Sequence, residues 1–99
     1  DITLSVCTGV FILADLGLLN GLTATTWFGA LPHLKKRYPA IKVASNCRWT
    51  DNGRIITTAG VSAGIDGALR VISKLISPDC ARRTAQFIEY PYHESDFNA

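Results

Sequence analysis

The sequence has no methionine, few charged residues and only three cysteines. The shortages of charge and of cysteine narrow the possible functions. Charged residues make up 18% of the 99 residues, and the formal net charge is +2. The longest basic run, residues 35–37, is typical of the solvated end of a helix, so we expect no nucleic-acid binding by this chain. Cys7, Cys47 and Cys80 lie far apart without zinc-ligand spacing, which indicates a reduced, cytoplasmic thiol protein without a metal.

Long apolar runs are missing as well. The longest, residues 10–19, is interrupted by Asp15 and Gly17 and falls short of the roughly 18 residues that cross a bilayer. The first residues do not resemble a secretory leader, so no membrane association is expected. The chain opens instead on a buried-strand pattern that needs neighbours on both edges, and we therefore expect further chain upstream of Asp1.

Apolar residues are plentiful, at 47% of the chain, which is enough for one small domain with a real core. Strand patterns alternate with helix patterns, and an Asn52-Gly53 turn joins two β-rich runs into a hairpin. This alternation predicts an α/β sandwich around a mostly parallel sheet with one β-hairpin. In chain order, the expected elements are a strand over 2–6, an apolar helix that begins at 9 and is ended by Gly17, a turn over 18–21, a strand over 22–25, a helix capped by Thr26 and stopped by Pro39, and an extended piece over 41–43. They continue with hairpin strands over 47–50 and 54–58, a helix that opens with the small residues 59–64 and runs to 76, a helix over 78–89 capped by Ser77, and an irregular tail over 91–99.

The helix after the hairpin is strongly amphipathic. Its expected apolar stripe consists of Ile65, Ala68, Leu69, Ile72, Leu75 and Ile76. Asp66 and Arg70 are spaced i,i+4, so we expect them to form an ion pair on the solvent side. The pattern Gly60-x-x-x-Gly64 lacks the ending of a phosphate loop and is explained by close helix–sheet packing.

A thiol stands between the first strand and the first helix, in Ser5-Val6-Cys7-Thr8-Gly9. At such a turn the sulfur lies at the carboxyl edge of a sheet, where the sites of open α/β folds lie, and free helix N–H groups favour a thiolate. Gly9 permits a sharp turn, as in a nucleophile elbow, and the amides of Thr8 and Gly9 are candidate oxyanion donors. From position alone, a reactive nucleophile and a buried core thiol explain Cys7 equally well.

A base for this thiol is hard to find in the sequence. His33 lies among lysines and His93 in the polar tail, which favours surface roles for both. Asp15 and Glu89 are better explained as solvated helix carboxylates. The strand ends at Thr26 and Gly60 belong to the same sheet edge as Cys7 and are candidate pocket residues.

Three longer stretches accompany the Cys7 motif: residues 14–26 (Ala-Asp-Leu-Gly-Leu-Leu-Asn-Gly, then Ala-Thr-Thr), residues 49–66 and residues 83–90. Together they resemble the ThiJ/PfpI family of glutamine-amidotransferase-like proteins, and the resemblance covers almost the whole chain. It implies a flavodoxin-like three-layer sandwich, with residues 1–99 forming the C-terminal half of one domain. It also implies that the carboxylate partner of the cysteine lies upstream of Asp1.

The resemblance assigns roles to individual residues. Cys7 and Thr8 correspond to the catalytic positions, and Thr26, Trp27 and Gly60 to the pocket, with a small-molecule substrate, no cofactor and a homodimer as in many members. Trp27 is a departure, because many members have a histidine after the two threonines. An indole there removes an acid–base group and adds bulk beside the pocket.

Thr8 sorts the chain within the family. The Cys-Thr-Gly sequence resembles the isonitrile hydratase branch, in which the thiolate attacks the isonitrile carbon and water releases a formamide. The same sequence occurs in the sensor domains of AraC-type transcription regulators, which makes a ligand-binding module the alternative. A third interpretation is a stress-related redox or deglycase-like protein in which Cys7 is oxidised to a sulfinate.

Overall fold

A computed structural model describes residues 1–95 of the chain. Within them, the strands are β1 (Thr3–Ser5), β2 (Thr23–Ala24), β3 (Lys42–Val43), β4 (Trp49–Asp51) and β5 (Ile55–Thr58). The helices are α1 (Val10–Asp15), α2 (Leu31–Arg37), α3 (Ala63–Leu75) and α4 (Pro78–Phe87), and 3₁₀ turns at Cys7–Gly9 and Phe28–Ala30 lead into α1 and α2. Residues 91–95 lie outside any helix or strand, as predicted, and residues 96–99 fall outside the described part.

The strands form two small sheets. The larger one has the order β1-β5-β4, with β1 parallel to β5 and β4 antiparallel to it, and the smaller one pairs β2 and β3 in parallel. The hairpin is the one predicted from the Asn52-Gly53 turn, and Gly53 has a positive φ of 92° that a glycine adopts without strain. A mostly parallel α/β fold with one antiparallel hairpin is confirmed.

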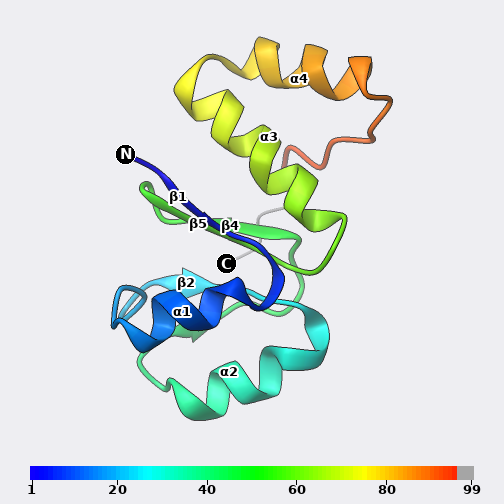
Figure 1. The fold of residues 1–99 in the computed structure, drawn as a ribbon. Coiled ribbons are helices and arrows are strands. Elements are labelled where there is room, and N and C mark those ends of the chain that lie inside the picture. The colour runs from blue at the N-terminus through cyan, green and yellow to red at the C-terminus, as the bar shows by residue number, and fades with distance from the viewer. Residues whose placement is uncertain (96–99) are drawn as a thin grey trace.

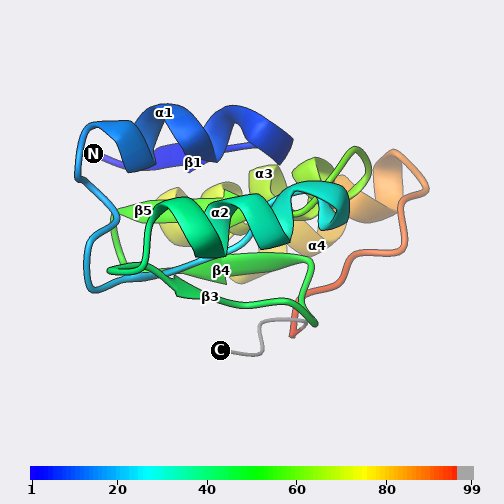
Figure 2. The same cartoon turned by 90° about the horizontal axis from the view of Figure 1, so that it is seen from below.

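The molecule is layered. Figure 1 shows α3 and α4 on one side of the β1-β5-β4 sheet and α1, β2 and α2 on the other. In Figure 2, seen from the side of α2, this helix crosses in front of the sheet with α1 and β1 alongside. Every layer therefore covers one apolar face of its neighbour, as expected for an α/β sandwich.

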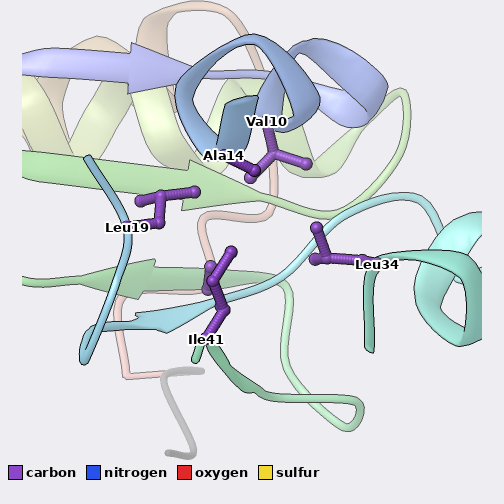
Figure 3. Packing of buried hydrophobic residues seen from close by; sticks show 6 residues of the cluster. Val10, Ala14, Leu19, Leu34 and Ile41 are labelled. Atoms are coloured by element: carbon purple, nitrogen blue, oxygen red, sulfur yellow. The ribbon is translucent and has the colours of Figure 1, made fainter. Parts of the chain in front are cut away.

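A hydrophobic core lies on the α1–α2 side. Its side chains come from α1, α2, β2, a loop and the approach to β3, several of them drawn in Figure 3, and all are at most 5% exposed. They are Val10, Ala14, Leu19, Ala24, Leu34 and Ile41. Burying several complete aliphatic side chains, each worth about 1.5–3 kcal/mol, fixes α1 and the turn before it against the rest of the fold.

Side-chain hydrogen bonds join β2 to the larger sheet. Asn52 exchanges two bonds with Thr23: its Oδ1 accepts from the Thr23 amide at 3.1 Å and its Nδ2 donates to the Thr23 carbonyl at 2.7 Å. The Thr25 amide donates to Thr57 Oγ1 at 2.8 Å. The two sheets are thus held in register by polar side chains, and β2 delivers Thr25 and Thr26 to the edge where β1 ends.

Of the expected helix ends, one is confirmed and one is wrong. α1 ends at Asp15, just before Gly17, whose left-handed φ of 75° terminates the helix as predicted. Thr26 does not cap α2, which begins at Leu31 with Pro32 in its first turn, where a missing N–H does no harm. The other predicted cap is confirmed: Ser77 Oγ accepts from the Cys80 amide at 3.0 Å at the start of α4.

The orientation of α3 is the largest correction. Ala63, Asp66, Gly67 and Leu69 are its buried residues, whereas Ile65, Leu75 and Ile76 are exposed. The cause is Gly67, whose missing side chain lets the helix approach β1 and β5 so closely that a Cβ would lie 2.3 Å from Thr58 Cγ2. The predicted apolar stripe is therefore only partly right: Leu69 is buried and Ile72 half-buried, but the rest of the stripe is exposed.

Candidate active site

Cys7 lies where β1 gives way to the turn that starts α1, as predicted. Its backbone has a φ of 56°, in the left-handed region that a residue with a side chain rarely adopts. Such a conformation costs about 1–3 kcal/mol and persists only where the surroundings hold it. A strained residue between strand and helix is the geometry of a nucleophile elbow, which presents the side chain at the sheet edge.

Hydrogen bonds on both sides hold this turn. Thr26 Oγ1 donates to the Cys7 carbonyl at 2.7 Å, and Thr58 Oγ1 donates to the Ser5 carbonyl at 3.2 Å. The Gly9 amide donates to the Val6 carbonyl at 3.0 Å. Of the two amides predicted to face an oxyanion, that of Gly9 is thus already engaged in the turn, and the assignment of Thr8 and Gly9 stays a prediction.

The Cys7 thiol itself is half-buried. Within residues 1–95, no side chain makes a hydrogen bond to the Cys7 sulfur. His33 stacks on Phe11 with ring centroids 5.4 Å apart, and Asp15 pairs with Arg37 and accepts from Tyr38. These residues take the surface roles that the sequence indicated.

Trp27 forms one wall beside the elbow. It follows Thr26 directly, is 42% exposed and packs on the glycines at 29 and 60. A Cβ on Gly60 would lie 2.6 Å from Trp27 Cδ1, and one on Gly29 would lie 2.6 Å from the far edge of the indole. Thr26 thus contacts the Cys7 carbonyl and Trp27 packs on Gly60, with the two glycines making room for the ring, and the assignment of these three residues to a pocket stays a prediction.

Asp66 is the residue that sequence reasoning misplaced most. Its carboxylate is fully buried and pairs with Arg48, Nε to Oδ2 at 2.8 Å, and not with Arg70. The Tyr90 hydroxyl donates to Oδ2 at 2.7 Å, and the His93 amide and Nδ1 lie 2.8 and 3.0 Å from Oδ1. We call Asp66, Arg48, Tyr90 and His93 the Asp66 cluster.

The carboxylate stays ionised in this cluster. Burial alone would raise the pKa of Asp66, but hydrogen bonds from the Tyr90 hydroxyl, the His93 amide and Arg48 outweigh it and lower the pKa below the ordinary 3.8. Burial and the hydrogen bond to Asp66 raise the pKa of Tyr90, which keeps its proton available for donation. The cluster is a satisfied buried ion pair.

The residues that sequence reasoning missed, Arg48 and Tyr90, did leave a signal. Ala63, Asp66 and Gly67 follow the i,i+3,i+4 spacing of one helix face, and small residues on a face mark close packing. An acid on that face must be paired. Arg48 directly precedes β4, next to the C-terminal end of β5. From there its side chain is within reach of Asp66.

Other kinds of site find little support. Within residues 1–95 no group of three or more His, Cys, Asp or Glu side chains could hold a metal ion, and no helix is long and apolar enough to span a membrane. An open pocket of about 330 Å³ lies between α4 and residues 90–94, with Tyr92 and Glu94 in its wall. None of the predicted site residues lines this pocket.

Known proteins with related sequences are both enzymes and regulators. The chain is 38% identical to an isonitrile hydratase of Pseudomonas putida over 87% of its length, and spans 36% of that protein. It is 34% identical to the HTH-type transcriptional regulator CdhR of Pseudomonas aeruginosa over 80% of its length, and spans 23% of it. No family model matches the chain.

Solved structures show the same fold. A ThiJ/PfpI family protein from Pseudomonas syringae is 33% identical, with a TM-score of 0.78 over 99% of this chain and 39% of its own. DJ-1beta of Drosophila melanogaster superposes with a TM-score of 0.81 over 92% of this chain and 47% of its own, at 19% identity. The chain thus spans less than half of each of these proteins, and it belongs to the DJ-1/ThiJ/PfpI superfamily, with the α/β fold of part of its flavodoxin-like domain.

Proposed function

We propose that Cys7 is the nucleophile of a small-molecule hydratase resembling isonitrile hydratase. The observation that carries the proposal is the left-handed backbone of Cys7, with a φ of 56°, at the junction of β1 and the turn into α1. A core thiol would gain nothing from such strain, whereas a reactive thiol gains exposure at the sheet edge. The identity to the Pseudomonas putida isonitrile hydratase, 38% over 87% of the chain, supports the same reaction class.

The proposed reaction adds water to an isonitrile in two steps. The Cys7 thiolate forms a C–S bond to the terminal isonitrile carbon, which takes up one proton and becomes a thioimidate. Water then adds to this carbon, the C–S bond breaks, and the products are the N-substituted formamide and the regenerated thiolate. Thr8 and a carboxylate upstream of Asp1 are proposed to handle the protons, and the Thr26, Trp27 and Gly60 wall to receive the substituent of the isonitrile.

Turnover by the full-length protein tests the proposal. We expect wild-type protein to convert alkyl isonitriles to formamides, detected by chromatography, and Cys7→Ser to lose at least about 100-fold in kcat. Cys80→Ser is the matched control, because this half-buried thiol lies on α4 and its loss leaves turnover unchanged. Undiminished turnover by Cys7→Ser would refute the nucleophile.

A ligand-sensing module is the second candidate. It is favoured by the 34% identity to CdhR and by Trp27, which supplies an apolar wall and no acid–base group. Isothermal titration with the same isonitriles separates the two. Tight binding without formamide production supports the sensor, and turnover supports the hydratase.

The proposed setting is the reducing cytoplasm, and the proposed assembly a homodimer. The compartment is proposed from the sequence, in which three cysteines lie far apart and are odd in number. Sedimentation equilibrium of the full-length protein measures the assembly, and a monomeric mass would contradict it.

A further inference from the structure

The segment 59–62 connects β5 to α3. We propose that Asp66, acting through Arg48, is a positioning residue that holds this segment against the Cys7 elbow. The inference rests on the proposed role of Cys7 as the reacting group. It concerns a residue that touches neither the thiol nor the pocket residues.

Arg48 forms hydrogen bonds with both ends of the segment 59–62. Its backbone carbonyl accepts from the Ala59 amide at 2.8 Å, and its guanidinium Nη2 donates to Ser62 Oγ at 2.8 Å. The same guanidinium donates through Nε to Asp66 Oδ2, also at 2.8 Å. Because Arg48 is a long, otherwise mobile side chain, the buried Asp66 carboxylate sets the place from which it reaches Ser62.

Tyr90 adds a second link from the Asp66 cluster. Its hydroxyl lies 2.7 Å from Asp66 Oδ2 and 3.0 Å from the Ser62 carbonyl, and it accepts from Arg48 Nη2 at 3.1 Å. Ser62 is exposed, so burial does not hold it in place. Its position follows from the hydrogen bond that Arg48 donates to its Oγ and from the one that the Ile65 amide donates to its carbonyl.

The backbone of the segment 59–62 is strained at Val61, so its conformation depends on these hydrogen bonds. Val61 has a φ of 45°, and a β-branched residue is a true outlier in that region. Its side chain is 85% exposed, so packing does not offset the cost of about 1–3 kcal/mol. The residues on either side, Gly60 and Ser62, must therefore hold the conformation.

Packing contacts with Trp27 and Val6 connect this segment and the start of α3 to the Cys7 elbow. Gly60 packs on Trp27, and the first turn of α3 packs on Val6, where a Cβ on Gly64 would lie 2.8 Å from Val6 Cγ1. Val6 directly precedes Cys7. A segment that swings outward would release Trp27 and the residue before the nucleophile together.

The test uses the three cysteines of the full-length protein as internal reporters. Labelling with iodoacetamide is followed by peptide mass spectrometry: Cys7 reports the site, Cys80 a half-buried thiol on α4, and the buried Cys47 global unfolding. Ser62→Ala removes the acceptor for Arg48 and leaves the buried Asp66–Arg48 pair intact. The matched control is Ser73→Ala, a half-buried serine about three turns further along α3.

We expect Ser62→Ala to raise the Cys7-to-Cys80 labelling ratio about threefold and Asp66→Asn about tenfold, with Cys47 unlabelled. Ser62→Thr keeps the hydroxyl and restores the wild-type ratio, which a merely structural loss would not do. Asp66→Asn also lowers kcat/KM mainly through kcat, because the pocket is misplaced while its residues remain.

An unchanged ratio in both Ser62→Ala and Asp66→Asn overturns the inference, as does an equal rise at Cys80. Should Asp66→Asn fail to fold, Ser62→Ala and its threonine rescue decide alone. The proposed function fails differently: wild-type Cys7 would then react no faster than Cys80. The two failures are therefore distinguished in one experiment.

Discussion

Two ion-pair clusters, each built around one aspartate, connect α3 to the two ends of β4. At the start of β4, Arg48 binds the fully buried Asp66. At its end, Asp51 pairs with Arg70 at 2.9 Å and Lys74 at 2.8 Å. We call Asp51, Arg70 and Lys74 the Asp51 cluster. Both carboxyls have a pKa below the ordinary 3.8, because hydrogen bonds from their partners outweigh burial.

The difference lies in the backbone that each cluster holds. The Asp51 cluster also binds the Gly53 amide and, through Lys74, the Gly53 carbonyl, so it closes the hairpin turn. The Asp66 cluster holds the segment 59–62 and the chain at 90–93, at the carboxyl edge of the parallel strands where Cys7 lies. Similar ion pairs thus serve a turn at one end and the candidate active site at the other.

Removing each carboxylate should separate the clusters most strongly. Asp66→Asn is expected to lower the free energy of unfolding by about 3–5 kcal/mol, since it places an amide N–H among the donors that surround a fully buried carboxylate. Asp51→Asn should cost about 1–2 kcal/mol, because Arg70 and Lys74 can turn to water. Urea denaturation followed by circular dichroism measures both. Equal losses would remove the distinction between the two ends.

Acid should reduce the advantage of wild-type protein over Asp66→Asn. The lowered folded pKa of Asp66 means that its stabilisation is complete above the unfolded value of about 3.9 and is lost as pH falls through the folded value. The gap between the two proteins is therefore expected to be constant from pH 7 to 5 and to shrink below pH 4. Urea midpoints at stepwise lower pH provide the measurement, and a gap that widens in acid would contradict the ionised pair.

Glycines near the two ends should behave differently. Gly64→Ala places a Cβ 2.8 Å from Val6 Cγ1, and overpacking of this kind costs about 1–3 kcal/mol and should raise Cys7 labelling. Gly53→Ala forces a side chain to a φ of 92° and should cost about 1 kcal/mol without changing Cys7. Gly9→Ala is the control for stability alone, because its Cβ would meet no atom within 4 Å and its φ of −58° suits alanine. A change in Cys7 labelling caused by Gly53→Ala would contradict the idea that the hairpin turn and the candidate active site are held independently.

The smallest expected effect concerns strain at the elbow. Cys7→Gly should be more stable than Cys7→Ala by about 1 kcal/mol, since glycine adopts a φ of 56° freely. The same pair of changes at Cys80, inside α4, should have the opposite order, because glycine weakens a helix. Thermal melts of the four variants give the comparison, and alanine proving better at both positions would deny the strain.

Much of the fold could be predicted from local signals. The hairpin followed from Asn52-Gly53, the start of α4 from Ser77 and Pro78, and the elbow from a thiol between a strand and a helix pattern. These features depend on residues close in sequence, where turn and capping preferences act directly. The family followed from the motifs around them.

The orientation of α3 could not be predicted in the same way. Its apolar periodicity favoured burying Ile65 and exposing Asp66, and the structure has the reverse. The deciding partners, Arg48, Tyr90 and His93, lie 18 to 27 residues away in the sequence. Long-range pairing made burial of a charge favourable, and no local pattern records such a pairing.

The reactivity of Cys7 in the native wild-type protein tests the central claim most directly. Limiting iodoacetamide at neutral pH, with the labelled peptides quantified over time, gives the rate at each of the three cysteines. An elbow nucleophile predicts that Cys7 reacts at least about tenfold faster than Cys80, with Cys47 protected by burial. A Cys7 that reacts no faster than Cys80 would contradict it.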